Sequence, residues 1–285
     1  MNRDAYLQLV SDLRRESDHL IEDLSGLTNQ MWTIPTPAAG WAIQDQVTHL
    51  AYFDDATLTA LRDPAEFRMF ADTLLAADTN IPERVAENNR DLTPEACLSW
   101  LISSRAELID ALSDQDPKAR LPWFGPEMSA ASCATARLME TWAHGRDIYD
   151  ALGVVPPPSS GLRSIAHLGV STFAFTHTIH DLAVPEEPVF VELRAATGEL
   201  WTWGPGDALN RVAGPAEDFA LVATQRRHWT ETALVAEGRV ATGWLEIAQA
   251  FAGAPTRRAK SRSGVATVQH SGKPMGAQRD STLQP

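Results

Sequence analysis

The stretch that decides the fold is LMETWAHGRDIYDALG, residues 138–153, which has the pattern of a helix. Glu140 and His144 are four residues apart in it, slightly more than one helical turn, so both side chains emerge on the same face. A carboxylate and an imidazole at this spacing also occur on solvated faces, where they form only a weak contact. The pair alone therefore leaves two interpretations open, a wet surface or one wall of a metal site.

The rest of the amino-terminal half has helical spacing of apolar residues too. A loop, TIPTPAAGW (33–41), contains two prolines and a glycine that stop any helix, and 64–92 is expected to be a shorter, turn-rich piece. Thr93 before Pro94 is a good helix N-cap with proline at the first helical position. Long helices are predicted at 4–24, 42–61, 93–113 and 129–152. Four such helices joined by loops favour a helix bundle, in which sites are built from side chains on facing helices.

The run VVPPPSSG (154–161) is the clearest boundary in the chain, and the pattern changes beyond it. VFVELRAATGELWTWG (189–204) has the alternation of a β-hairpin, and TALVAEG (232–238) is a candidate strand. Helices are expected at 160–176, after Pro215 and at 239–251. The predicted fold class is α+β overall: a four-helix domain at 1–155, a smaller α+β domain at 156–255 packed over the open end of the bundle, and a disordered tail at 256–285.

Composition narrows the classes of function. Hydrophobic residues make up 44% and charged residues 21% of the 285 residues, which is ordinary for a soluble globular protein. A formal charge of −13 argues against nucleic acid as a partner. No apolar run approaches the roughly 20 residues of a membrane span, and the charged amino terminus is not a signal peptide. We therefore expect a cytoplasmic protein, monomeric or homodimeric, whose Cys97 and Cys133 are buried or half-buried thiols.

The second predicted helix carries His49 in GWAIQDQVTHLAYFDDAT (40–57). Taken alone, His49 is a half-buried histidine that packs against Phe53, one turn away. Asp54 falls on the apolar stripe of this helix, where a carboxylate is costly to bury unless it is paired. Asp54 either orients a metal-bound imidazole, as carboxylates often do, or lies at the rim.

A histidine on one helix, with a glutamate and a histidine on another, is enough for a three-ligand site inside a bundle. Two nitrogens and a carboxylate oxygen from His49, Glu140 and His144 suit zinc, and three protein ligands leave the open position that catalytic zinc sites keep. Nickel or iron(II) would accept the same ligands.

Two motifs strengthen this hypothesis by resemblance. WAIQDQVTHL (41–50) and ETWAHGRDI (140–148) resemble the amino-terminal half of the mycothiol-dependent maleylpyruvate isomerase family, within the DinB-like metal-binding four-helix proteins. The matching residues are Trp41, Ile43, Val47, His49 and Leu50 in the first motif and Glu140, His144, Gly145 and Asp147 in the second. The resemblance implies that His49, Glu140 and His144 are metal ligands. The resemblance covers about residues 5–255. Its carboxy-terminal part is similar to a branch of the family known mainly as uncharacterised metal-binding proteins.

The resemblance also implies an arginine, at the end of a helix, that holds an anionic substrate. Arg226 is the best match, with Arg227 beside it, although a helix C-terminus favours positive charge without any function. The family pattern has a small residue before this arginine, where this chain has Gln225. His177 and His180 match no family motif.

We therefore expect a metal-dependent enzyme acting on a small, anionic or electrophilic molecule. By resemblance it is a thiol-dependent isomerase or S-transferase that uses mycothiol or a similar thiol as cosubstrate, with Arg226 neutralising a substrate carboxylate. From its place on the second helix, Asp54 is expected to support a metal ligand. Two alternatives stay open: a thiol-independent metal-dependent hydrolase, lyase or cyclase, and a non-catalytic metal-binding stress protein.

Overall fold

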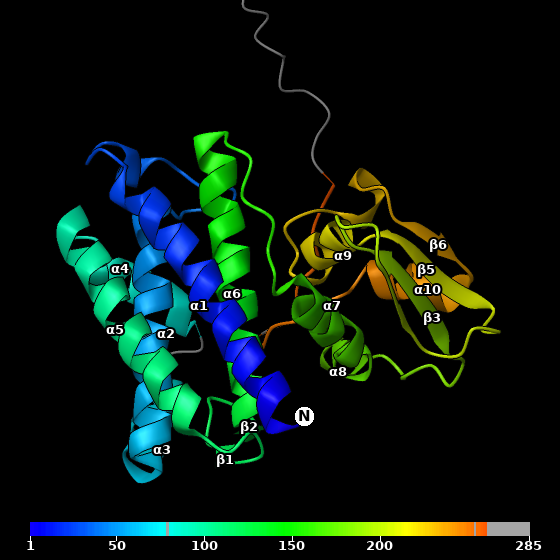
Figure 1. The fold of residues 1–285 in the computed structure, drawn as a ribbon, viewed down its shortest axis with the longest axis horizontal. Coiled ribbons are helices and arrows are strands. Elements are labelled where there is room, and N and C mark those ends of the chain that lie inside the picture. The colour runs from blue at the N-terminus through cyan, green and yellow to red at the C-terminus, as the bar shows by residue number, and fades with distance from the viewer. Residues whose placement is uncertain (78–79, 254, 261–285) are drawn as a thin grey trace, which may run out of the picture.

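The computed structural model describes residues 1–77, 80–253 and 255–260 of the chain. Its amino-terminal part is a bundle of four long helices (Figure 1). Helices α1 and α2 each pack against both α5 and α6, which closes the bundle around an apolar core. The helices are α1 (Arg3–Ser25), α2 (Ile43–Arg62), α5 (Pro94–Asp114) and α6 (Ala130–Leu152). The predicted four-helix bundle is therefore confirmed.

Side chains with local hydrogen bonds define where these helices begin. The hydroxyl of Thr93 accepts from the backbone N–H of Ala96 at 3.2 Å, so the predicted N-cap of α5 is confirmed. Ser129 caps α6 in the same way, and Gly153 ends that helix in the left-handed conformation, with φ of 67°. At the start of α2 the carboxylate of Asp45 accepts from the Ala42 N–H at 2.8 Å.

The segment expected to be turn-rich is in fact mostly helical. Asp63 caps its first helix by accepting from the N–H groups of Ala65 and Glu66. Phe67 on the first helix and Val85 on the second are buried in a small apolar cluster against α2. Local sequence pattern does not show such tertiary contacts. The elements are α3 (Pro64–Ala77), α4 (Ile81–Asn89), a short 3₁₀-helix η1 (Met31–Thr33), and the two-residue strands β1 (Arg120–Leu121) and β2 (Met128–Ser129).

The carboxy-terminal part combines helices with a four-stranded sheet in the order β4-β3-β5-β6. The predicted hairpin is confirmed, since β3 and β4 are antiparallel with Val191 opposite Trp203. The sequence pattern missed β5, which lies parallel to β3 and places Val212 beside Val191. The strands are β3 (Val189–Arg194), β4 (Leu200–Trp203), β5 (Asn210–Pro215) and β6 (Val235–Glu237).

The helices of this part also differ in detail from the prediction. The single helix expected at 160–176 is divided into two at Thr172, and the last helix ends at Leu245 rather than near 251. The elements are α7 (Leu162–Ser171), α8 (Phe173–Ile179), α9 (Ala216–Ala223), the 3₁₀-helix η2 (Trp229–Glu231) and α10 (Arg239–Leu245). Of the predicted tail, 256–260 have no helix or strand, and 261–285 lie outside the described residues.

The sheet-bearing part packs against the flank of α6 and not over an end of the bundle (Figure 1). Ion pairs join the two parts along the carboxy-terminal half of α6: Arg146–Glu217, Asp147–Arg226 and Asp150–Arg227. These contacts bring the end of α9 next to the turns of α6 that follow Glu140 and His144. The division of the chain into domains at residue 155 stays a prediction.

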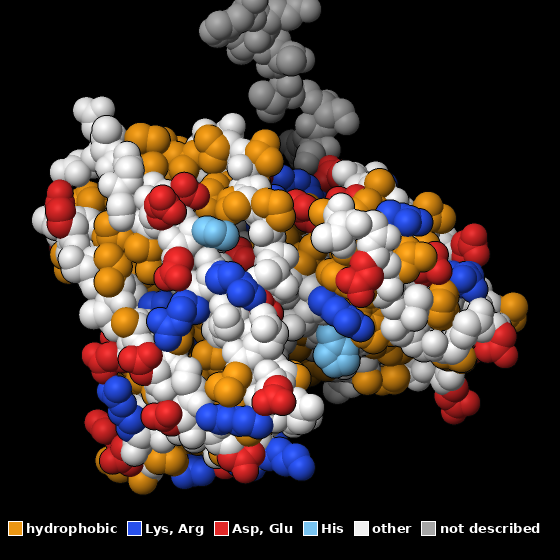
Figure 2. Space-filling view, in the orientation of Figure 1, with side chains coloured by type: hydrophobic (Ala, Val, Ile, Leu, Met, Phe, Trp, Pro, Cys, Tyr) orange, Lys and Arg blue, Asp and Glu red, His pale blue; other side chains and the backbone are white. Residues whose placement is uncertain are grey.

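The surface of the two parts carries charges of both signs. On the face shown in Figure 2, acidic and basic side chains are interspersed over both parts. Within the described ranges, no helix is long and apolar enough to cross a membrane.

Candidate metal centre

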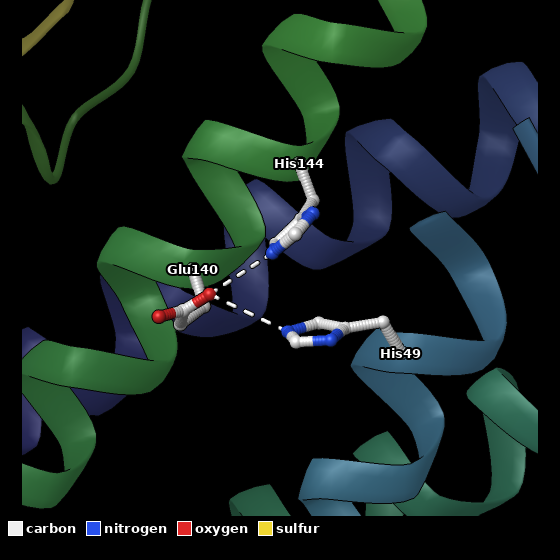
Figure 3. Close-up of side chains that lie close together, drawn as sticks. All are labelled: His49, Glu140 and His144. Carbon is white, nitrogen blue, oxygen red and sulfur yellow. Dashed lines mark hydrogen bonds and ion pairs between the residues drawn. The ribbon is translucent and has the colours of Figure 1, made fainter. Parts of the chain in front are cut away.

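The two motifs of the sequence meet inside the bundle. His49 comes from α2, and Glu140 and His144 come from successive turns of α6; Figure 3 shows all three side chains pointing toward one another. One ligand atom from each residue can be chosen so that all three lie within 4.8 Å of one another. The fold therefore brings the three residues together across about ninety residues of sequence.

The contacts converge on one carboxylate oxygen. Glu140 Oε2 lies 3.0 Å from His144 Nε2 and 3.6 Å from His49 Nε2. The two imidazole rings lie against each other, with ring centroids 4.2 Å apart. Both histidines are buried, whereas the Glu140 side chain keeps 23% of its surface exposed. The three donor atoms thus lie close enough together to hold one ion.

Burial sets the protonation states of the group. Burial lowers the pKa of His144 to about 3 and also lowers the pKa of His49. Burial acts to raise the pKa of Glu140, but the contacts with His144 and His49 outweigh it and hold the pKa of that carboxyl well below its usual value. Two neutral imidazoles and one carboxylate are the forms in which these residues bind a divalent metal. The donor set and its protonation fit zinc, nickel or iron(II).

Aromatic rings line the histidines. The indole of Trp41 stacks at 6.0 Å on His144, with 18° between the planes, and lies 5.4 Å from His49. Trp41 is itself held by a hydrogen bond from Nε1 to Glu83 on α4, 3.0 Å long. Phe53 packs on the other histidine, with ring centroids 4.7 Å apart, so the predicted contact between His49 and Phe53 is confirmed. These rings and the two imidazoles thus form one aromatic group.

Gln46, one turn before His49 on α2, also contacts the site, although the sequence pattern gave no prediction for it. Its amide oxygen contacts Nδ1 of His144, and its amide nitrogen donates to the hydroxyl of Thr36 at 2.8 Å. Gln46 is 0% exposed, and a fully buried amide on a ligand-bearing helix must find partners. The need of a buried amide for partners was the only sign in the sequence that could have pointed to Gln46. Its partner His144 lies 98 residues away in sequence, so local pattern could not identify it.

Asp54 is placed differently from the expectation. It is completely buried, and its carboxylate accepts from Arg105 Nε at 2.6 Å and from Arg137 Nε at 3.0 Å. These partners are arginines and not ligand histidines, so the structure does not put Asp54 in the supporting role that we expected. The reason is electrostatic, because a buried carboxylate is stabilised far more by charged donors than by a neutral imidazole.

Arg226 follows α9 and reaches α6 beside the site. Its Nη2 donates to Asp147 at 2.8 Å, and its Nη1 donates to the carbonyl of Thr224 at 2.8 Å. Its positive charge contributes to lowering the pKa of both His49 and His144, after the larger effect of burial. Arg226 therefore lies within electrostatic range of the three residues.

Comparison with known proteins supports this picture. The family model described as the mycothiol maleylpyruvate isomerase N-terminal domain matches residues 13–149, which include His49, Glu140 and His144. Two uncharacterised proteins of Mycobacterium tuberculosis, from strains CDC 1551 and H37Rv, are each 46% identical over 248 residues, covering 87% of this chain and 96% of theirs. The chain belongs to the mycothiol maleylpyruvate isomerase N-terminal domain family.

Solved structures extend the likeness to the whole fold. The mycothiol-dependent maleylpyruvate isomerase and a mutant of it each match with a TM-score of 0.55 and 17% identity, covering 83% of this chain and 93% of theirs. At this identity the likeness concerns the fold alone. A second family model, described as wyosine base formation, matches residues 185–237, the segment that forms the sheet and α9.

The departure from the family pattern before Arg226 has a structural explanation. Gln225 has a φ of 59°, in the left-handed region where a small residue is least strained. Its amide nitrogen donates to the carbonyls of Ala248 and Thr256, at 3.2 and 2.9 Å, and its oxygen accepts from the Thr256 hydroxyl at 2.6 Å. These contacts offset the backbone strain and tie the turn to the last described segment.

The unmatched histidines lie in α8 and just after it. His177 is buried, with Nδ1 contacting the carbonyl of Phe173 at 2.8 Å and its ring 4.5 Å from that of Phe173. His180 follows α8, and burial lowers its pKa. The structure does not bring either histidine into the group formed by His49, Glu140 and His144.

Proposed function

We propose that this protein is a metal-dependent enzyme that uses a low-molecular-weight thiol, mycothiol or a similar compound, to isomerise or S-conjugate a small unsaturated acid. The observation that carries the proposal is the convergence of His49, Glu140 and His144 at one point, with Arg226 in electrostatic range. The names of the related proteins supply the thiol and the reaction class, because the matching family and the solved structures are described as a mycothiol-dependent isomerase.

His49, Glu140 and His144 would hold the metal, and zinc suits these ligands best. A divalent metal with an open position lowers the pKa of a bound water or thiol, so that the nucleophile is available near neutral pH. The three side chains would hold the ion in one place, because α2 and α6 pack against each other in the bundle.

Arg226 is proposed to bind the carboxylate of the substrate. A guanidinium has five N–H donors, and the contacts with Asp147 and Thr224 engage two of its nitrogens. An incoming carboxylate can therefore pair with the same side chain in a charge-assisted contact. This role explains why a cation at the end of α9 is directed to α6 beside the site and not to solvent.

The chain's own cysteines do not supply the thiol. Cys97 and Cys133 are both buried, and burial raises the pKa of the first to about 11 and of the second to about 12. Both stay protonated near neutral pH and are inert as nucleophiles. A thiol-dependent reaction would therefore need an external thiol.

The proposed reaction conserves its atoms. The thiolate adds to one carbon of an electron-poor double bond, and the electron pair moves into the conjugated carbonyl group. Rotation about the resulting single bond and expulsion of the thiolate give the isomer and regenerate the nucleophile. Protonation of the adduct before expulsion would instead leave the thiol attached, which is an S-transfer.

The experiment has two stages. Elemental analysis of the purified protein should give about one zinc, nickel or iron per chain, and His49→Ala should lose it. The metal-loaded protein is then assayed for isomerisation of maleylpyruvate with and without mycothiol. Arg226→Gln should raise KM for the acid, whereas Arg227→Gln, the adjacent control, should not.

The outcomes separate the alternatives. Turnover of an electrophilic substrate without any thiol would favour a hydrolase, lyase or cyclase over the proposal. Stoichiometric metal with no turnover of unsaturated acids would favour a metal-binding protein without catalysis. Wild-type protein that cannot be loaded with metal would remove the basis of the proposal.

A further inference from the structure

A hydrogen-bond chain beside the site has a direction that can be assigned from one end. The hydroxyl of Thr36 lies 3.0 Å from the carbonyl oxygen of Trp41, which can only accept, so the single hydroxyl proton is donated there. The same hydroxyl oxygen lies 2.8 Å from the amide of Gln46 and has no second proton to give. Gln46 must therefore turn its NH₂ group toward Thr36 and its oxygen toward His144.

This direction fixes the proton on His144. The Gln46 oxygen only accepts, so Nδ1 of His144 carries the hydrogen in this contact. When the ring is neutral this is its single N–H, so Nε2 is the nitrogen left with a lone pair. Nε2 faces the Glu140 carboxylate oxygen at 3.0 Å, on the side where His49 and Glu140 lie (Figure 3).

We infer that Gln46, itself oriented by Thr36 and Trp41, is a positioning residue that fixes the Nδ1–H tautomer of His144 and so presents the Nε2 lone pair to the metal. The role of this tautomer in metal binding rests on the proposed function. The tautomer itself is a property of the metal-free chain and can be measured without a metal. Partners of this kind on the second nitrogen of a ligand histidine fix the orientation of the ring and raise its basicity.

The other histidine shows that this device is specific to His144. Nδ1 of His49 is buried without a hydrogen-bond partner among the described residues, so no comparable chain selects its tautomer. The site thus has one ligand prepared by hydrogen bonds and one held by packing between Trp41 and Phe53. Loss of Gln46 should therefore change which ring nitrogen of His144 carries the hydrogen, and should leave the tautomer of His49 unchanged.

The test is nitrogen-15 NMR of the full chain, labelled at histidine, without metal and then with zinc. In the metal-free protein, His144 should have its proton on Nδ1. Gln46→Leu removes the acceptor, so His144 should change to the Nε2–H form or a mixture of both forms. Zinc affinity, measured by competition with a chromophoric chelator, should fall about 10- to 100-fold in that variant.

Two further variants make the result specific. Gln46→Glu keeps an acceptor facing Nδ1 and should restore both the tautomer and the zinc affinity. Thr36→Val removes the group that orients the amide and should give a smaller change in the same direction, which tests the inference even if Gln46→Leu does not fold. Gln44→Leu on the same helix is the control that should leave His144 unchanged. Among the described residues, the Gln44 amide nitrogen donates to the backbone carbonyls of 89, 90 and 92.

An Nε2–H form of His144 in the wild-type protein, or unchanged tautomer and zinc affinity in both Gln46→Leu and Thr36→Val, would overturn the inference. The proposed function fails separately. If the wild-type protein binds no zinc, the metal site is wrong, while the tautomer measurement still decides the role of Gln46.

Discussion

Two buried polar clusters lie inside the bundle, one built from α2, α5 and α6 and the other from α2 and α6. They differ in how hydrogen-bond donors are matched to acceptors. In one, which we call the arginine cluster, Arg105 and Arg137 both donate to Asp54, so charged donors meet a charged acceptor. In the other, the triad of His49, Glu140 and His144, nitrogens with lowered pKa face a carboxylate. The first cluster is complete by itself, whereas the second becomes complete when a cation is added. Burial and charge alone do not separate structure from function here, but the matching of donors to acceptors does.

The strongest test of this difference is to remove one carboxylate from each cluster. Asp54→Asn leaves two buried guanidinium groups poorly compensated and should lower the free energy of unfolding by about 3–5 kcal/mol. Glu140→Gln should cost far less in the metal-free protein, because the new amide can donate to the His144 lone pair. Urea denaturation in the presence of a chelator measures both, and equal losses would mean that the two clusters do not differ.

Metal addition should act on the triad only. At a free zinc concentration of 100 times Kd, the wild-type protein should gain about 2.7 kcal/mol of stability, because zinc binds the folded chain and not the unfolded one. Glu140→Gln should gain little, since it removes a ligand. Arg105→Lys keeps the triad and should retain the gain despite its lower starting stability. Thermal unfolding with and without zinc gives the comparison, and a loss of the gain in Arg105→Lys would show that the clusters are coupled.

The stability of the metal-free protein should fall as the pH is lowered from about 6.5 toward 5. His144 has its pKa lowered from 6.5 to about 3, so in this window the unfolded chain takes up a proton that the folded chain does not. Each such histidine contributes up to about 1.4 kcal/mol per pH unit, and His49, with its pKa also lowered, adds in the same direction. Glu140 faces both and Arg226 adds positive charge, but the usual pKa of a glutamate, 4.5, lies below this window.

The control for this prediction is His144→Gln, which removes one titrating group. Its stability in chelator should depend less steeply on pH between 6.5 and 5 than that of the wild-type protein. The same slope in both proteins would show that His144 is protonated in the folded state at these pH values.

Local pattern was sufficient for the four long helices of the bundle, because periodicity is a property of neighbouring residues. The motifs that contain His49, Glu140 and His144 were each visible in the sequence, but joining them into one group rested on the resemblance to a family. Local pattern was insufficient where the partner is remote. Asp54 was recognised as a costly buried carboxylate, but its partners Arg105 and Arg137 lie 51 and 83 residues further along the chain. The role of Gln46 was not predicted for the same reason, because its partner His144 is 98 residues away. Strand β5 was missed because pairing with β3, and not an alternation of apolar and polar residues, determines its position.

The smallest expected effect concerns the sheet-bearing part and its link to the triad. The charge of Arg226 helps to lower the pKa of His49 and His144, so Arg226→Gln, which keeps a donor for Asp147, should raise both pKa values in the metal-free protein. Arg227→Gln should not, because that guanidinium pairs with Asp150, six residues further along α6 than His144. Titration by NMR decides between them. Equal shifts would mean that α9 acts on the triad only through overall charge, whereas a shift confined to Arg226→Gln would place one side chain of the second part at the metal centre of the first.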